Sequence, residues 1–508
     1  MAAIRDYQKD FGPIRSILFP VYKSEIPKLI PLFASFFLIA FIYSLLRPAK
    51  LALILSSKGS GAEVVPFLKV YAVLPTALFF VFLISKLSNK YSREKVFYII
   101  ISIFLSFFAI FTFILYPNRE MLELTTLGDY LQSMLRPGLK GFVDMIRYWP
   151  ISAFYVISEL WATIILTTLF WGFVNQITSV GEAARFYALF SLSANFSGIF
   201  AGNLSKYISD YPYIESLSCL GPNPWAQHLS IIMSLIIVAG LITIAIFYKI
   251  NRQAANYVKR EKKKTKKYKL STLECFSYVL RFRYLSYIAV MVISYSIINN
   301  LTEVIWQSKI KEHFAEGDGI SKYVAHTTTI IGYISATIDM FFTGNIIRIF
   351  GWGIAALMTP IVAIATGMFF YASVLSEQLG YNEMLYAFFN NPSTNLLIMF
   401  STAHVCATRG LKYTLFDASK EIAYIPITTE AQHKGKAAID GVCSRFGKSG
   451  GSIIFQLLFY IFGSLEACIP YVIGIIFLLM FMWISTVTSL NKHIKKTDIN
   501  KIREKFNS

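Results

Sequence analysis

The sequence predicts an all-α polytopic membrane protein with about twelve transmembrane helices in two six-helix halves. Apolar residues make up 55% of the 508-residue chain and charged residues only 15%, whereas a soluble domain carries about 25% charged residues. The mean hydropathy is +0.54. These charged residues are too few to coat several soluble domains, so we expect most of the chain to lie in lipid. The chain nevertheless carries a net charge of +19, which the topology must explain.

Apolar stretches of the roughly 20 residues that a helix needs to cross a bilayer recur along the chain. They lie at 29–49, 66–86, 95–116, 152–174, 186–206, 228–248, 285–307, 325–344, 353–376, 392–408, 438–463 and 468–488. An even number of spans places both termini on the same side of the membrane.

The basic residues indicate which side that is. The N-terminus, the loops after the even-numbered spans and the C-terminal tail hold about 34 of the 48 lysines and arginines. Because basic loops stay in the cytoplasm, both termini are predicted to be cytoplasmic. The net charge then reflects topology, and no nucleic-acid partner is needed to explain it.

A basic stretch between the sixth and seventh spans divides the chain. The predicted organisation is a cytoplasmic segment 1–28, a first half 29–248, a basic cytoplasmic linker 249–284, a second half 285–488 and a basic cytoplasmic tail 489–508. We expect the linker to rest on anionic lipid headgroups. Two six-helix halves joined in this way are the layout of major-facilitator-type carriers.

Four charged residues lie where lipid is expected. They are Lys50 at the end of the first span, Glu159 in the fourth, Glu303 in the seventh and Lys448 in the eleventh. An ion near the bilayer centre costs about 2.5–3.5 kcal/mol on insertion scales, so each should face a cavity or a partner. In the major-facilitator layout, the first, fourth and seventh helices line the central pathway. These charges therefore predict a solute pathway.

Further polar residues on the same and neighbouring spans are secondary candidates for the site. Asn299 and Gln307 flank Glu303 at a spacing of four residues, which places all three on one helix face. Pro48, between the first-span residues Arg47 and Lys50, is expected to break the helix. The full secondary set is Arg47, Arg445, Lys69, Asn195, Asn299 and Gln307. For Arg47, Lys69 and Arg445, a structural ion pair or an interfacial position remains an equal alternative.

Separated cations together with two carboxylates suit a polyvalent organic anion, because arginine and lysine are the usual phosphate ligands. No metal-ligand spacing, catalytic group or cofactor is predicted. The stretch 441–449 resembles a Walker A loop but has five residues between its glycines where the loop needs four. Gly447 with Gly451, and Gly198 with Gly202, more simply predict close helix packing. A membrane enzyme acting through the loop 417–440 and a structural or receptor protein are the other classes considered.

Several long motifs resemble the ATP/ADP translocases, the nucleotide transporters of plastids and obligate intracellular bacteria. The resembling stretches are Gly59–Lys69, Phe154–Trp161, Phe170–Phe173, Ala184–Phe190, Glu303–Lys309, Phe416–Pro426, Lys434–Asp440 and Arg445–Gly451. They extend from the first span to the eleventh and so cover nearly the whole chain.

This resemblance implies a major-facilitator-like fold and exchange of external ATP for internal ADP plus phosphate. The nucleotides and phosphate are then transported substrates and not cofactors. The four functional charges of that family correspond to Lys50, Glu159, Glu303 and Lys448. The resemblance also implies the inner membrane of a bacterium, most simply an obligate intracellular one. We expect a monomer, although the sequence leaves the oligomeric state open.

The sequence departs from that family at two places. The first span reads Leu46-Arg-Pro-Ala-Lys-Leu51, without the two aspartates that the family commonly has there, and Asn175-Gln176 stands where the family often has Asn-Glu. Proton-coupled net import of several nucleoside triphosphates on the same fold therefore remains the alternative to exchange.

Overall fold

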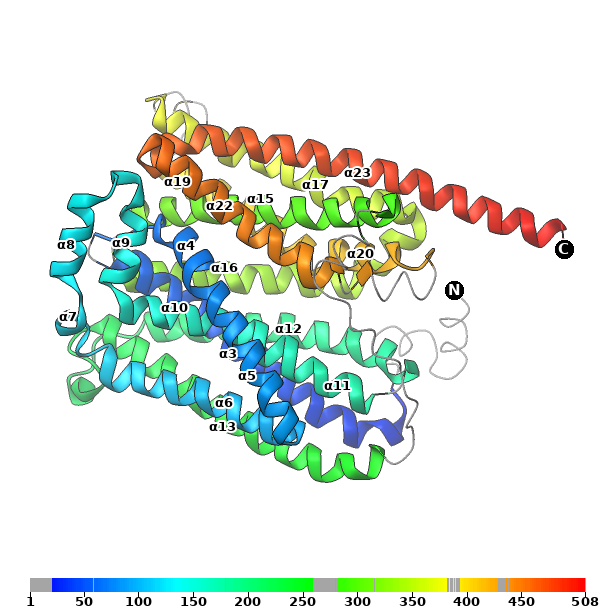
Figure 1. The fold of residues 1–508 in the computed structure, drawn as a ribbon, viewed down its shortest axis with the longest axis horizontal. Coiled ribbons are helices and arrows are strands. Elements are labelled where there is room, and N and C mark those ends of the chain that lie inside the picture. Colours follow the sequence, from blue (N-terminus) through cyan, green and yellow to red (C-terminus); the bar gives the residue numbers. More distant parts are fainter. Residues whose placement is uncertain are drawn as a thin grey trace.

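The chain forms an elongated bundle of helices in the computed structural model (Figure 1). The structure describes residues 21–57, 59–178, 180–258, 281–314, 316–381, 393–427 and 438–507, with single positions between these ranges. Within them every regular element is a helix, which confirms the all-α prediction.

We call α3 to α13 the N-terminal helices and α15 to α23 the C-terminal helices. The N-terminal elements are η1 (Lys23–Glu25), α3 (Ile26–Ser56), α4 (Val64–Phe67), η2 (Leu68–Val73), α5 (Leu74–Lys90), α6 (Arg93–Ile110), η3 (Phe111–Leu115), α7 (Arg119–Leu122), α8 (Thr125–Met134), η4 (Pro137–Leu139), α9 (Lys140–Arg147), α10 (Trp149–Trp161), η5 (Ala162–Phe170), α11 (Trp171–Ile177), α12 (Val180–Ser209), η6 (Glu215–Leu220) and α13 (Pro224–Val258). The C-terminal elements are α15 (Arg283–His313), α16 (Gly317–Thr337), η7 (Ile338–Phe342), α17 (Thr343–Gln378), α19 (Ser393–Leu411), η8 (Lys412–Phe416), α20 (Asp417–Ala423), η9 (Ile439–Cys443), α22 (Ser444–Phe462) and α23 (Leu465–Asn507).

Each of the twelve predicted spans coincides with a helix or with consecutive helical segments in the described residues. Among those residues, eight helices are long and apolar enough to cross a membrane. The helices of the fifth, eighth, tenth and eleventh spans (α12, α16, α19 and α22) are more polar. All four pack against other helices of the bundle, so their polar side chains have protein neighbours.

Several boundaries differ from the sequence prediction. Pro48 does not break the first span, because α3 continues through it to Ser56, and Lys50 consequently lies within the helix and not at its end. α13 continues ten residues into the predicted linker, whose residues 259–278 lie outside the described residues. α23 continues through the predicted tail to Asn507.

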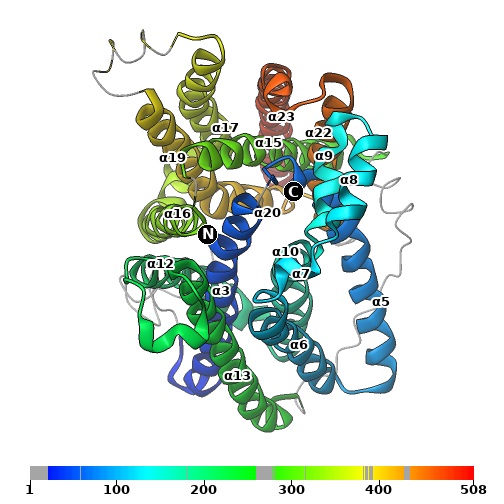
Figure 2. The same cartoon turned by 90° about the vertical axis from the view of Figure 1, so that its left-hand side faces the viewer.

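The interior contains two large apolar clusters. One consists of residues between Val21 and Ile250, and the other is formed mainly by residues between Val279 and Leu490. Viewed along the bundle, α3, α6, α12 and α13 occupy one side and α15, α17, α19 and α23 the other, while α8 and α9 overlap α22 (Figure 2). The second cluster also contains Leu51, Ala52, Leu55, Ala62 and Phe67 of the first half, so the two halves share apolar packing near the end of α3 and along α4.

The two ends of the bundle differ in how these sets of helices meet. α3 begins and α23 ends at the same end, which we call the terminal end, and α7, α8 and α9 lie at the opposite, distal end (Figure 1). At the distal end, Lys311 of α15 donates a hydrogen bond to the carbonyl of Ser60. Gln456 of α22 donates to the carbonyl of Pro66 in α4 at 3.0 Å.

A histidine–carboxylate contact and an ion pair reinforce this closure. His228 of α13 contacts Asp318 of α16 at 2.9 Å, and Lys322 of α16 pairs with Asp210 just after α12. Toward the terminal end, α22 no longer packs closely on the second span, because α5 packs on α6 and η5 instead. The two sets of described helices are therefore in contact at the distal end. Toward the terminal end, α5 and α22 separate from each other.

Glycines allow helices to approach closely, both between the two sets (α12 and α16) and within the C-terminal set (α15 and α22). A Cβ atom at Gly202 of α12 would collide with Thr329 and with the carbonyl of Ala325 in α16, and one at Gly451 of α22 would lie 2.9 Å from the Asn300 Cβ. The predicted packing faces at Gly198–Gly202 and Gly447–Gly451 thus lie between helices. Small residues drive such packing in membranes because they bring the backbones into van der Waals contact.

We predict that Gly202→Leu destabilises the bundle by about 1–3 kcal/mol, since the larger side chain overpacks the α12–α16 interface. Thermal unfolding of the detergent-solubilised protein measures this loss. Gly474→Leu on α23 is the matched control, because nothing lies within 4 Å of a Cβ atom there. Equal melting temperatures for the two variants would contradict the packing role.

A second prediction concerns Asp144 in α9 at the distal end. Burial raises the pKa of this carboxyl group to about 6, and its Oδ2 has no hydrogen-bond partner among the described residues. A raised pKa means that folding favours the protonated acid, so the Asp144 contribution to stability falls as the pH rises from about 4 to about 6. Asp144→Asn should therefore be more stable than wild type by on the order of 2 kcal/mol above pH 6.

Melting temperatures of both proteins between pH 4.5 and 8 test this prediction. The difference between them should grow up to about pH 6 and then stay constant. A difference that does not change with pH would show that the carboxyl group ionises without penalty.

Candidate functional site

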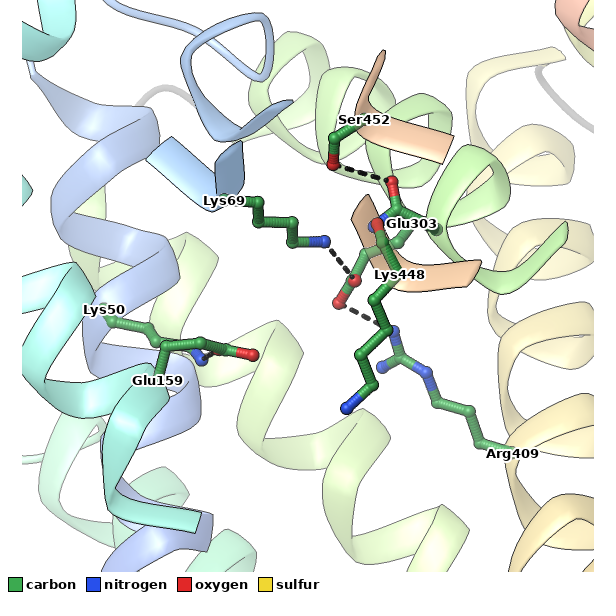
Figure 3. A network of polar contacts seen from close by, with 8 residues as sticks. Lys50, Lys69, Glu159, Glu303, Arg409, Lys448 and Ser452 are labelled. Carbon is green, nitrogen blue, oxygen red and sulfur yellow. Dashed lines mark hydrogen bonds and ion pairs between the residues drawn. The ribbon is translucent and has the colours of Figure 1, made fainter. Parts of the chain in front are cut away.

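The centre of the bundle brings together the four charged residues that the sequence analysis selected (Figure 3). Lys50 of α3 forms an ion pair with Glu159 of α10. The Lys50 ammonium also lies 5.8 Å from the ring centre of Tyr43 and 5.2 Å from that of Tyr155. Both partners of the ion pair belong to the N-terminal helices, so this pair neutralises charge within one half.

Glu303 of α15 has two cationic partners. Lys69 of η2 donates to its Oε2 at 3.2 Å, and Arg409 of α19 donates to its Oε1 at 3.0 Å (Figure 3). Lys69 comes from the N-terminal helices and Arg409 from the C-terminal helices. One carboxylate therefore links the two sets of helices at their centre.

Lys448 of α22 extends its side chain into the space between these pairs (Figure 3). Its backbone is fixed because Asn300 of α15 donates to the Lys448 carbonyl at 3.0 Å and Ser452 donates to Asn300 at 3.3 Å. The side chain is exposed to solvent although it lies at the centre of the bundle. No ion pair holds its ammonium group among the residues that the structure describes.

Arg47 of α3 is a second cation without an ion pair in the described part of the chain, and it lies within electrostatic range of Glu303. We define the central cluster as Arg47, Lys50, Lys69, Glu159, Glu303, Arg409 and Lys448. It contains five cations and two carboxylates, which gives a net charge of +3. An excess of cations in a partly buried site favours a polyvalent anion.

The other secondary candidates lie in different positions. Asn299 lines a small pocket together with Glu303 and Arg409. Gln307 is buried, and its side-chain oxygen has no partner among the described residues. Asn195 of α12 donates to Asp339 of η7 at 3.1 Å, outside the central cluster, and so joins the two sets of helices toward the terminal end. Arg445 is exposed beside η9.

Arg409 was missed by the sequence analysis. The tenth span was predicted to end at residue 408, which made Arg409 a loop residue, whereas α19 continues to Leu411 and leads directly into η8. Its side chain is 7% exposed and its guanidinium lies 5.2 Å from the ring centre of Trp306. The signal that could have revealed it is the apolar pattern continuing beyond residue 408.

Short π-helical segments lie beside several of these residues. η2 contains Lys69, η5 follows Glu159 after two residues and η9 directly precedes the turn of α22 that leads to Lys448. Such segments insert an extra residue into a helical turn and are frequent at functional sites. Here they change which side chains face the centre along three of the helices that surround it.

The sequence matches one protein family over almost its whole length. The model of the TLC ATP/ADP transporter family matches residues 4–494. The chain belongs to the TLC ATP/ADP transporter family. Among its TLC relatives, the "ADP,ATP carrier protein 1" of Chlamydia pneumoniae is 39% identical over 492 residues, which cover 96% of this chain and 95% of the relative. The "Plastidic ATP/ADP-transporter" of Solanum tuberosum is 37% identical over 474 residues, covering 91% and 72% of the two chains.

Solved structures place this TLC family member among major-facilitator-like transporters by fold. A bacterial homologue of the iron transporter ferroportin in an inward-facing state aligns with a TM-score of 0.52 at 12% identity, covering 92% of this chain and 98% of the other. A D-xylose-proton symporter aligns with a TM-score of 0.51 at 12% identity, covering 91% and 96%. At these identities the likeness concerns the fold alone. The fold-class prediction is confirmed.

We predict that the Lys50–Glu159 ion pair contributes to the stability of the folded protein. Lys50→Gln leaves Glu159 without its ion-pair partner in the interior, which should cost about 1–3 kcal/mol, less than a fully buried pair because Glu159 is 29% exposed. The double variant Lys50→Gln/Glu159→Gln removes both charges and should recover part of that loss. Thermal unfolding of the purified proteins, arranged as a double-mutant cycle, measures the coupling.

Lys206→Gln serves as the control for the loss of a lysine, since Lys206 is exposed on α12 outside the central cluster. It should melt close to wild type. Strictly additive effects of the two site substitutions would show that the pair contributes no coupling energy.

Proposed function

We propose that this protein is a nucleotide transporter that exchanges external ATP for internal ADP plus phosphate by alternating access. The observation that supports this most directly is the central cluster, where five cations face two carboxylates between the N-terminal and the C-terminal helices. Polyphosphates are polyvalent anions at neutral pH, and charge-assisted hydrogen bonds from lysine and arginine are their strongest protein contacts. Nucleotides and phosphate are in this proposal the transported substrates, and the protein carries out no chemical step on them.

Within the central cluster, Lys448 and Arg47 are the cations most available to a ligand. Both lack an ion pair among the described residues, so a phosphate group gains their attraction without displacing a carboxylate. Lys50 and Lys69 become available when Glu159 and Glu303 release them. The relatives described above carry ADP,ATP carrier names, which supports adenine nucleotides as the substrates.

We infer that the terminal end faces the cytoplasm of a bacterium and that the protein lies in the inner membrane. The bias of lysine and arginine toward the segments at that end supports this orientation. The closed distal end and the parting of α5 from α22 then correspond to a carrier open toward the cytoplasm. We further propose that the two six-helix halves are the units that rock about the central cluster during transport.

Uptake of radiolabelled ATP into proteoliposomes tests the function. Vesicles preloaded with ADP should take up label much faster than vesicles without internal nucleotide, because an exchanger needs a counter-substrate. Equal uptake with and without internal ADP, together with a response to an imposed pH gradient, would favour proton-coupled net import instead. No uptake under any loading, by protein shown to be folded and inserted, would refute nucleotide transport.

We predict that Lys448→Gln lowers ATP uptake about 10- to 100-fold, since a charged hydrogen bond to phosphate contributes about 1.5–3 kcal/mol and the cluster loses part of its charge excess. Lys206→Gln is the matched control and should transport at the wild-type rate, since its side chain lies outside the cluster. Uptake by Lys448→Gln comparable to wild type would overturn the assignment of Lys448 as a substrate ligand.

A further inference from the structure

The carboxylate of Glu303 is held by Arg409, the arginine that the sequence analysis missed. Arg409 uses its Nη2 to hold Glu303 Oε1 at 3.0 Å, and its Nη1 is buried without a hydrogen-bond partner among the described residues. The guanidinium also lies against Trp306 on the same helix as Glu303. Both Trp306 and Glu303 belong to α15, so Arg409 fixes this carboxylate within the C-terminal helices.

Lys69 holds the other oxygen of the same carboxylate from the opposite set of helices. Lys69 is 14% exposed and Glu303 is 22% exposed, so water screens this pair only partly. Separating the two side chains would leave an ammonium group and a carboxylate with reduced hydration, which is costly unless each finds another partner.

The position of this link connects it to the distal end. Pro66, whose carbonyl accepts the hydrogen bond from Gln456 of α22, lies three residues before Lys69. Lys311, which binds the Ser60 carbonyl, lies eight residues after Glu303 on α15. Opening the distal end must move α4 and η2 away from α15 and α22, and this movement also separates Lys69 from Glu303.

We propose that the Lys69–Glu303 pair locks the empty carrier at its distal end, and that Arg409 is the positioning residue that retains Glu303 when a substrate phosphate takes over Lys69. This proposal rests on the nucleotide exchange proposed above. With nucleotide bound, Lys69 gains a phosphate and Glu303 keeps Arg409, so the distal end opens with every charge paired. Without nucleotide, opening leaves Lys69 unpaired, and the empty carrier stays closed.

This arrangement explains why transport would be an exchange. After releasing imported ATP at the terminal end, the carrier returns to the distal-open state only when another anion occupies Lys69. Internal ADP supplies that anion. An arginine suits the positioning role because its planar guanidinium binds a carboxylate and stacks on an aromatic ring at the same time, which a lysine ammonium cannot reproduce.

Proteoliposomes containing the full-length protein test the lock. The measurement is the ratio of labelled ATP uptake into ADP-loaded vesicles to uptake into nucleotide-free vesicles. Lys69→Gln should lower this ratio by about tenfold, within the usual range of coupling between linked events. An unchanged ratio in a variant that still transports would overturn the proposal.

Arg409 variants test the positioning role. In Arg409→Gln, Lys69 is the remaining ion-pair partner of Glu303. A phosphate that takes over Lys69 therefore leaves the Glu303 carboxylate without an ion pair. The maximal exchange rate should fall by about tenfold or more while the dependence on internal ADP remains, and Arg409→Lys should recover part of the rate because it restores the charge. Wild-type exchange kinetics in Arg409→Gln would contradict the role.

Lys322→Gln is the matched control, since it also removes an ion pair between the two sets of helices at the distal end. That pair is exposed, with 46% and 44% of the two side chains accessible, and exposed pairs contribute little. The uptake ratio of this variant should therefore stay at the wild-type value. A fall in the uptake ratio as large as that of Lys69→Gln would mean that loss of any distal ion pair weakens the dependence on internal ADP. The Lys69–Glu303 pair would then not be the lock.

A labelling experiment keeps the proposal testable even if a variant does not transport. Ala62 is 1% exposed at the distal interface, and Ala62→Cys in a Cys219→Ser background places a small reactive group there. A membrane-impermeant maleimide should label this cysteine slowly without nucleotide and about tenfold faster when Lys69→Gln is added. Equal labelling would overturn the lock. Because this measurement needs no substrate, it separates failure of the lock from failure of nucleotide transport.

Discussion

The structure depends on the pairing of charges inside a bundle that lipid surrounds. Glu303 is the centre of this pairing, because its two oxygens bind Lys69 at 3.2 Å and Arg409 at 3.0 Å from opposite sets of helices. A carboxylate in this position would be costly without partners. Once it is paired in this way, the spacing of η2, α15 and α19 around the centre is set by ion-pair geometry as well as by apolar packing.

The surrounding helices bring these charges together through two different kinds of contact. Glycines at positions such as Gly447 and Gly451 let α22 lie directly on α15, so that Asn300 reaches the Lys448 backbone. Hydrogen bonds and ion pairs close the distal end, whereas α5 diverges from α22 toward the terminal end. Packing holds α22 on α15 and α12 on α16, whereas the hydrogen bonds and ion pairs that join the two sets at the distal end are the contacts that opening of that end breaks.

Charge and exposure together explain how one site accommodates a polyanion and also remains stable when empty. The two glutamates pair with Lys50, Lys69 and Arg409 in the absence of a ligand. Lys448 is exposed within the centre, where water solvates its charge until a ligand arrives. A site with every cation already paired would bind polyphosphates weakly, and a site with none paired would repel itself.

The sequence by itself determined the membrane class, the helical spans, the four main charges and the family resemblance. These features depend on composition, on the cost of placing ions in lipid and on long local motifs, all of which a single sequence contains. Only the tertiary structure decided which charges are partners, that Pro48 lies inside a continuous α3, and that Arg409 belongs to the site. Partner choice depends on how helices far apart in the chain pack, and the end of α19 depends on its neighbours. Local periodicity encodes neither the choice of partners nor the position of Arg409 beside Glu303, although the apolar pattern beyond residue 408 does indicate that the tenth span continues.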